Sequence, residues 1–229
     1  MPSMKRLKPL LFACLAIAAV APAGAGADVR EVGQPEAFPA PACPENCQAI
    51  AQVSGYNVEI GKSKNTFRIN RPGKVVAFTM RLGEPNADQL NYFKTTFGAT
   101  SQARVSILKP AKTKQRHRLM RQSELFNLEP YFGTTPTFGL DRALKVEKGN
   151  IIAVTVPTWA PAFSHGLSNE HAWRSSHHDD DCTSAMPPAA AQMSINSLRV
   201  YGCFYRTARL LYSVHFVLDP TPKSTASKK

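Results

Sequence analysis

Apolar and polar residues alternate along most of this chain with a period of two, the side-chain repeat of a β-strand. In residues 74–82 the apolar positions expected to share one face are Val76, Phe78, Met80 and Leu82. The segment Ile151–Trp159 is more continuously apolar, and Ile152, Val154 and Val156 mark its core face. Strands are predicted near residues 56–60, 67–69, 74–82, 103–108, 124–128, 140–146, 151–156, 198–205 and 210–218.

The predicted fold is all-β: an antiparallel β-sandwich, jelly-roll or immunoglobulin-like, with about eight strands and one long loop. The alternation breaks at residues 83–102, where Asn86 could cap a single helical turn and a covering loop is the alternative. No amphipathic helix of three turns is expected. Residues 48–218 are interpreted as one sandwich domain.

The N-terminus has the pattern of an export signal. Lys5, Arg6 and Lys8 precede an apolar run, Leu10–Val20, and small residues end at Ala27. A signal peptide at 1–27, cleaved after Ala27, predicts a secreted protein, extracellular or in the cell envelope, without a transmembrane segment in the mature chain. Cys14 lies inside the apolar run and not at its end, which argues against a lipid anchor.

The segments flanking the domain lack periodicity. Residues 28–47 form a Pro- and Ala-rich leader that we expect to be flexible, with a turn between Cys43 and Cys47, and residues 219–229 are an expected disordered tail. The likeness to exported bacterial β-sandwich modules rests on this overall pattern alone.

Four cysteines remain after export, and an even number in an oxidising compartment predicts disulfides with three possible connectivities. We favour Cys43 with Cys47, because both lie in one short turn, and Cys182 with Cys203, which would pin the end of the long loop. A metal site is the weaker reading, because a CxxxC pair without a second close pair is not a zinc-ribbon spacing.

The whole chain carries a formal charge of +12, and loss of the signal peptide lowers it to +9. A basic exported protein attracts anionic polymers, although net charge also serves solubility. The chain has a basic run from Lys109 to Arg121, which includes His117. From Lys112 to Arg118 the charges fall on every second residue, so in extended conformation they would project from one face about 7 Å apart. The alternating residues are Lys112, Lys114, Arg116 and Arg118. The alternative is a solvated loop between two strands.

The loop after Trp159 contains residues that bind metals elsewhere. These candidate ligands for zinc, copper or nickel are His165, His171, His177, His178, Asp179 and Asp181. Nothing in the loop matches HExxH, and the run Asp179–Asp181 lacks the alternating oxygen ligands of a calcium loop. The alternative is a polar loop whose histidines bind nothing.

Aromatic residues of the same region form a third candidate site. Trp159, Phe163 and Trp173 could stack against sugar rings, as exposed aromatics do in carbohydrate-binding sandwiches. The alternative is that such a tryptophan closes one end of the core.

Enzymatic motifs are weak in this sequence. There is no GxSxG elbow, and Gly55–Ser63 has one residue too many for a phosphate-binding loop. We therefore predict a non-catalytic secreted module that binds a glycan or another anionic polymer at the cell envelope, with no cofactor and no specific nucleic acid. The alternatives are a metal-binding protein or metal-dependent enzyme using the His-rich loop 163–181, and a structural envelope protein without a small ligand.

Overall fold

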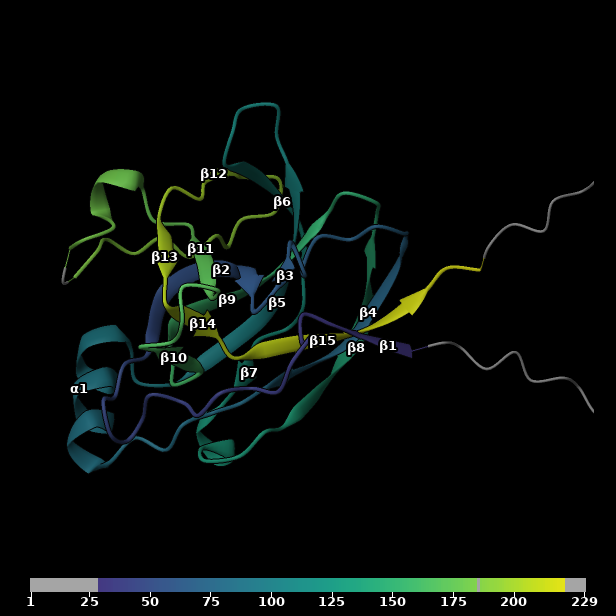
Figure 1. Cartoon of the computed structure of the whole chain (residues 1–229). Helices are drawn as coiled ribbons and strands as arrows, with labels where there is room; N and C mark the ends of the chain where they lie inside the picture. The colour runs from purple at the N-terminus through teal and green to yellow at the C-terminus, as the bar shows by residue number, and fades with distance from the viewer. Residues whose placement is uncertain (1–28, 185, 221–229) are drawn as a thin grey trace, which may run out of the picture.

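A computed structural model describes residues 29–184 and 186–220 of the chain (Figure 1). The predicted signal peptide and residues 221–229 of the predicted tail lie outside the described residues. The described part is nearly all antiparallel β-structure with a single α-helix, as the alternation predicted. No helix within residues 29–184 and 186–220 is long and apolar enough to cross a lipid bilayer.

One sheet has four strands in the order β1-β15-β4-β8. Their bounds are Val29–Val32 for β1, Tyr212–Leu218 for β15, Gly73–Met80 for β4 and Thr137–Val146 for β8. All neighbours in this sheet pair antiparallel. The sheet therefore joins the first and the last described strands of the chain.

The larger sheet has nine strands, with the path β12-β6-β5-β9-β2-β11-β13 and two short strands, β3 and β7, paired to β2 and β5. The bounds are Leu198–Val200 (β12), Arg116–Gln122 (β6), Gln102–Pro110 (β5), Ile151–Ala160 (β9), Ile50–Ile60 (β2), Ala172–Ser175 (β11), Phe204–Arg206 (β13), Ser63–Lys64 (β3) and Phe126–Asn127 (β7). A separate pair joins β10 (Phe163–His165) to β14 (Ala208–Leu210).

Both sheets contribute side chains to one main core. Phe78 of β4 and Val214 of β15 belong to the same buried cluster as Val154 of β9. A second, smaller cluster, which includes Ile151 and Ala153, covers the opposite face of β9. Because β9 is packed on both faces, its residues from 151 to 156 are all buried, which explains why this segment is apolar without strict alternation.

The predicted face of β4 is correct at Phe78, Met80 and Leu82, which are buried. It is wrong at Val76, which is only half-buried, whereas Val75 is fully buried. The pairing of β4 with β8 shifts register between Val75 and Ala77, and such a bulge exchanges the faces of the residues on either side.

The segment expected to be a single turn or a covering loop is a three-turn helix, α1 (Ala87–Phe97). Asn86 caps it as anticipated: its side chain accepts a hydrogen bond from the backbone N–H of Gln89, whose side chain in turn accepts from the Asn86 backbone N–H. The helix buries Phe93 against Trp159, with ring centroids 5.1 Å apart. This contact with a distant strand stabilises a helix that the local sequence favours only weakly.

The leader expected to be flexible is attached to the domain along its described length. Strand β1 pairs with β15, and the Glu36 carboxylate lies 3.5 Å from the Arg209 guanidinium, which is fully buried. Arg209 also donates a hydrogen bond to the carbonyl oxygen of Ala37. A buried guanidinium needs these acceptors, so the leader completes the domain.

Both predicted disulfides are present. Cys43 is bonded to Cys47, and Cys182 is bonded to Cys203, which directly precedes β13. The second bond closes the long loop that follows β9, as the cysteine spacing indicated. Two short 3-10 helices, η1 (Glu129–Tyr131) and η2 (Asp179–Asp181), complete the described elements.

Candidate anion-binding surface

The basic run forms the projecting end of the β5–β6 hairpin (Figure 1). Lys112 and Lys114 lie in its turn, and Arg116 and Arg118 lie on β6; all four side chains are exposed. The alternating spacing expected for the four residues holds only on β6, because the chain turns at Gln115, which has a φ of 64°. The turn nevertheless gathers the charges at one tip.

Strand register places like charges directly across from one another. Lys109 of β5, which is exposed, pairs with Arg118 of β6, so both side chains project from the same face of the hairpin. Like charges in directly opposite positions destabilise an antiparallel pair. We define the basic hairpin as Lys109, Lys112, Lys114, Arg116 and Arg118.

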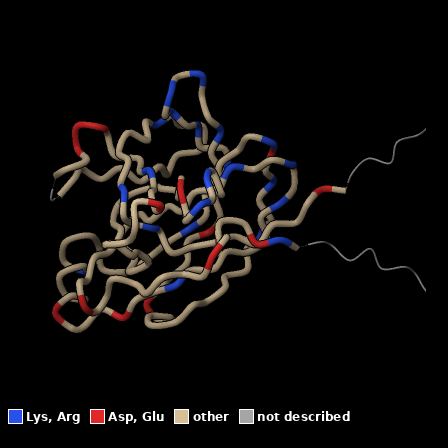
Figure 2. The backbone as a smooth tube through the Cα atoms, in the orientation of Figure 1, with Lys and Arg blue, Asp and Glu red and all other residues tan. Residues whose placement is uncertain are grey.

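The basic hairpin has no acidic counterpart among the residues that the structure describes. None of its five members takes part in a salt bridge there, and no Asp or Glu occurs from Lys109 to Ser123. Arg118 donates a hydrogen bond to the carbonyl oxygen of Asn196 at 2.6 Å. Figure 2 shows Lys and Arg at the hairpin tip and a continuous acidic stretch on a different loop.

The opposite face of the hairpin is packed and holds it in place. His117 is buried there, its Nε2 lies 2.9 Å from the Tyr56 hydroxyl, and its ring packs against that of Tyr201. Burial, together with the charges of Arg174 and Arg68, lowers the pKa of His117 to about 4. His117 is therefore neutral at pH 7 and adds no charge to the basic run.

The chain between Ala190 and Tyr201 covers this packed face, and Gln192 is the centre of its hydrogen bonds. The Gln192 side chain donates to the Ser197 carbonyl at 2.9 Å and accepts from the Tyr201 hydroxyl at 2.9 Å. The Gln192 backbone N–H donates to the Ser54 hydroxyl of β2, also at 2.9 Å. This buried, satisfied network fixes the covering segment on the sheet.

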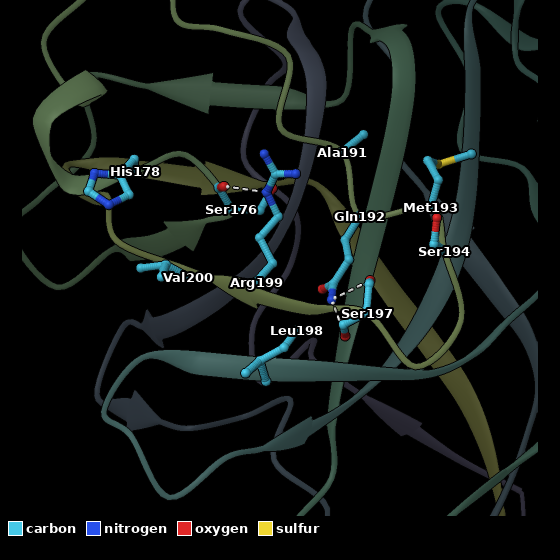
Figure 3. A pocket seen from close by; sticks show the side chains of 10 residues that line it. All are labelled: Ser176, His178, Ala191, Gln192, Met193, Ser194, Ser197, Leu198, Arg199 and Val200. Carbon is cyan, nitrogen blue, oxygen red and sulfur yellow. Dashed lines mark hydrogen bonds between the residues drawn. The ribbon is translucent and has the colours of Figure 1, made fainter.

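A cavity of about 390 Å³ lies beside the covering segment, and Figure 3 shows its lining. Arg199 lines this cavity, and its Nε donates a hydrogen bond to the Ser176 carbonyl at 3.2 Å. The other lining residues include Ser194, Ser197 and the exposed His178. Hydroxyl, guanidinium and imidazole groups are donors that suit a small anionic group.

The structure does not bring the histidines of the long loop together. The Nε2 atom of His165 lies 3.0 Å from the Asn46 carbonyl oxygen, His171 pairs with Glu36 at 3.4 Å, and His177 is buried beside Ser175. Among the described residues, the metal-ligand atoms that cluster within 4.8 Å belong to His178, Asp179 and Asp180, all exposed. The six expected ligands therefore do not converge on one point: His178 and Asp179 lie together, whereas the other three histidines lie on separate strands and turns.

The His178 cluster has its own electrostatic explanation. The hydrogen bond that the His178 ring donates to the Asp180 carboxylate, together with the negative charges of Asp180 and Asp179, raises the pKa of His178. An exposed imidazole beside carboxylates forms such a surface pair without any metal.

The three predicted aromatic residues divide into two groups. Trp159 is fully buried and donates its indole N–H to the Gly98 carbonyl at 2.9 Å, so it closes the core beneath α1. Phe163 and Trp173 do meet, with centroids 5.9 Å apart, and Trp173 stacks on Tyr205.

Phe163, Trp173 and Tyr205 line a second cavity of about 460 Å³, together with His165 and His177. Only 8% of Phe163 and 5% of Trp173 is exposed, so neither ring is an open platform for a sugar. Tyr205 was not singled out from the sequence, because only the pairing of β11 with β13 brings it to Trp173.

No protein-family model, curated protein or solved structure matches the chain.

Proposed function

We propose that this protein is a non-catalytic extracellular or cell-envelope module that binds an anionic polymer through the basic hairpin. The observation that carries the proposal is the presence of five exposed basic side chains on one hairpin, with Lys109 directly opposite Arg118 and none of the five in a salt bridge among the described residues. Anionic groups of a ligand would relieve this repulsion. The two disulfides are compatible with an extracellular location.

The packed face of the hairpin supports the same role. Because His117 and the covering segment hold β6, the charges are presented on an ordered backbone, and binding requires little further ordering of the chain. Each phosphate or sulfate that contacts a Lys or Arg releases a counterion, so affinity should fall steeply with salt. With five charges available, log K should fall by about 3.5 to 4.5 for each tenfold rise in salt concentration.

Heparin chromatography of the mature protein tests the proposal. The variant Lys112→Ala, Lys114→Ala, Arg116→Ala, Arg118→Ala should elute at a much lower salt concentration than the wild type. A matched control removes four exposed charges elsewhere: Lys62→Ala, Lys64→Ala, Arg142→Ala and Lys148→Ala. Both variants have the same net charge, so net charge alone would shift them equally.

The control variant should elute from heparin at nearly the same salt concentration as the wild type. Equal losses in the two variants would show that retention reflects net charge, and unchanged retention of the hairpin variant would refute the proposal directly. Circular dichroism and thermal melting confirm that both variants remain folded.

A further inference from the structure

We propose that the basic hairpin and the adjoining loop Met193–Leu198 together form a docking surface for an anionic lipid bilayer. This inference rests on the proposed function of the hairpin and narrows its partner from anionic polymers in general to a lipid surface. Three observations carry it: exposed apolar side chains, a rigid loop, and the register that places them beside the charges.

The loop displays apolar side chains to solvent. The exposed fractions are 39% for Met193, 51% for Ile195 and 43% for Leu198. These are three of the eight large hydrophobic residues that are exposed among residues 29–184 and 186–220, and they lie within six positions. Scattered exposed hydrophobics are ordinary, but a local group of them marks an interaction surface.

Hydrogen bonds to β6 fix the backbone of the loop. Asn196 donates its backbone N–H to the Leu119 carbonyl at 2.8 Å, and Leu119 donates to the Ser197 carbonyl at 3.0 Å. Gln192, immediately before the loop, is anchored in the buried network described above. Because this backbone is fixed, Ile195 and its neighbours cannot readily fold back onto the protein. The loop is therefore already ordered before it binds a partner.

Register places apolar and basic side chains on one face. Leu198 of the edge strand β12 pairs with Arg118 of β6, and Arg118 pairs with Lys109 of β5. Residues directly opposite in antiparallel strands share a face, so one row across three strands reads apolar, basic, basic. Figure 3 shows Leu198 on β12 and Met193 at the other end of the same short loop.

This combination fits an anionic bilayer better than a dissolved polymer. Phosphate headgroups complement the Lys and Arg side chains, while Ile195 and Leu198 would enter the boundary between headgroups and acyl chains. A soluble glycan or polyphosphate would engage the charges and leave the apolar side chains in water. Apolar insertion or electrostatic attraction alone gives only weak membrane binding. Stable binding usually combines the two, as a basic patch beside apolar side chains can.

Vesicle co-sedimentation tests the inference with the mature protein. Phosphatidylcholine vesicles with phosphatidylglycerol should bind it, and vesicles of phosphatidylcholine alone should not. The variant Ile195→Ser, Leu198→Ser should lose about tenfold or more in affinity for the mixed vesicles, from the loss of apolar burial. It should keep wild-type retention on heparin, because every basic residue remains.

Two further variants complete the design. The control Val29→Ser, Leu125→Ser removes two exposed apolar side chains from other strands and loops and should bind vesicles like the wild type. In Ile195→Trp, the added indole should shift its emission to shorter wavelength with mixed vesicles and be quenched by brominated acyl chains. The two native tryptophans are at most 5% exposed and should contribute little to that change.

The outcomes separate the two proposals. If Ile195→Ser, Leu198→Ser binds vesicles like the wild type, or the Ile195→Trp emission does not shift, the lipid inference is overturned while the hairpin proposal stands. If the wild type is retained on heparin but binds no vesicles, the lipid inference is likewise overturned, and the ligand of the hairpin is a soluble polymer. If the hairpin variant keeps its retention on heparin, the proposed function itself fails.

Discussion

Protonation of His117 should destabilise the fold that supports the basic hairpin. The imidazole is 5% exposed and is packed between Tyr56 and Tyr201, with the positive charges of Arg174 and Arg68 acting on it. The two tyrosines cannot compensate for an added positive charge, because burial raises the pKa of both, that of Tyr56 to about 12. A proton on His117 would therefore be an unpaired buried charge.

The sign and size of the effect follow from the pKa of His117. It is about 4 in the folded protein and 6.5 in an ordinary histidine, so between these pH values the unfolded chain binds a proton that the folded chain does not. The free energy of unfolding is then greatest above pH 6.5 and falls as the pH drops toward 4. The difference between the two pKa values corresponds to a loss of about 3 kcal/mol.

Urea unfolding of the mature protein at several pH values from 7 to 4 measures this loss. His117→Phe keeps a ring against Tyr56 and Tyr201 but cannot be protonated, so we expect it to lose less stability than the wild type over this range, by about 3 kcal/mol. His165→Asn, on β10, is the matched control and should lose as much stability on acidification as the wild type. Parallel pH profiles for the wild type and His117→Phe would refute the reasoning.

Two other substitutions probe the elements around the site. Replacing Cys182 and Cys203 by Ser opens a crosslink between residues 21 positions apart and should lower the free energy of unfolding by about 3 kcal/mol in denaturant titrations; a change near zero would show that the long loop is held by its other contacts. Trp159→Ala removes the fully buried ring beneath α1 and should destabilise the protein by about 3 to 5 kcal/mol. Trp159→Phe should cause a smaller loss of stability, because it keeps a ring but removes the hydrogen bond to Gly98. Equal stability of Trp159→Ala and the wild type would contradict the role assigned to this ring.

Features that depend on near neighbours in the sequence could be predicted. The disulfides join residues 4 and 21 positions apart, and such short separations favour one pairing over the other two. The charges of the basic hairpin are gathered by a turn between adjacent strands, so their proximity is also local. The helix α1 was missed although Leu90, Phe93 and Phe97 have helical spacing, because its stability comes from Trp159, more than sixty residues away.

The alternation of apolar and polar residues by itself determined that this protein is an antiparallel β-fold, because side chains on a strand must alternate between a core and another surface. Only the tertiary structure decided which distant segments share a face. Leu198 meets Arg118 through strand pairing across 80 positions, whereas His165, His171 and His177, within 12 positions of one another, have separate partners. Strand register sets these contacts, and a displacement of one residue would turn Leu198 away from the charges beside it.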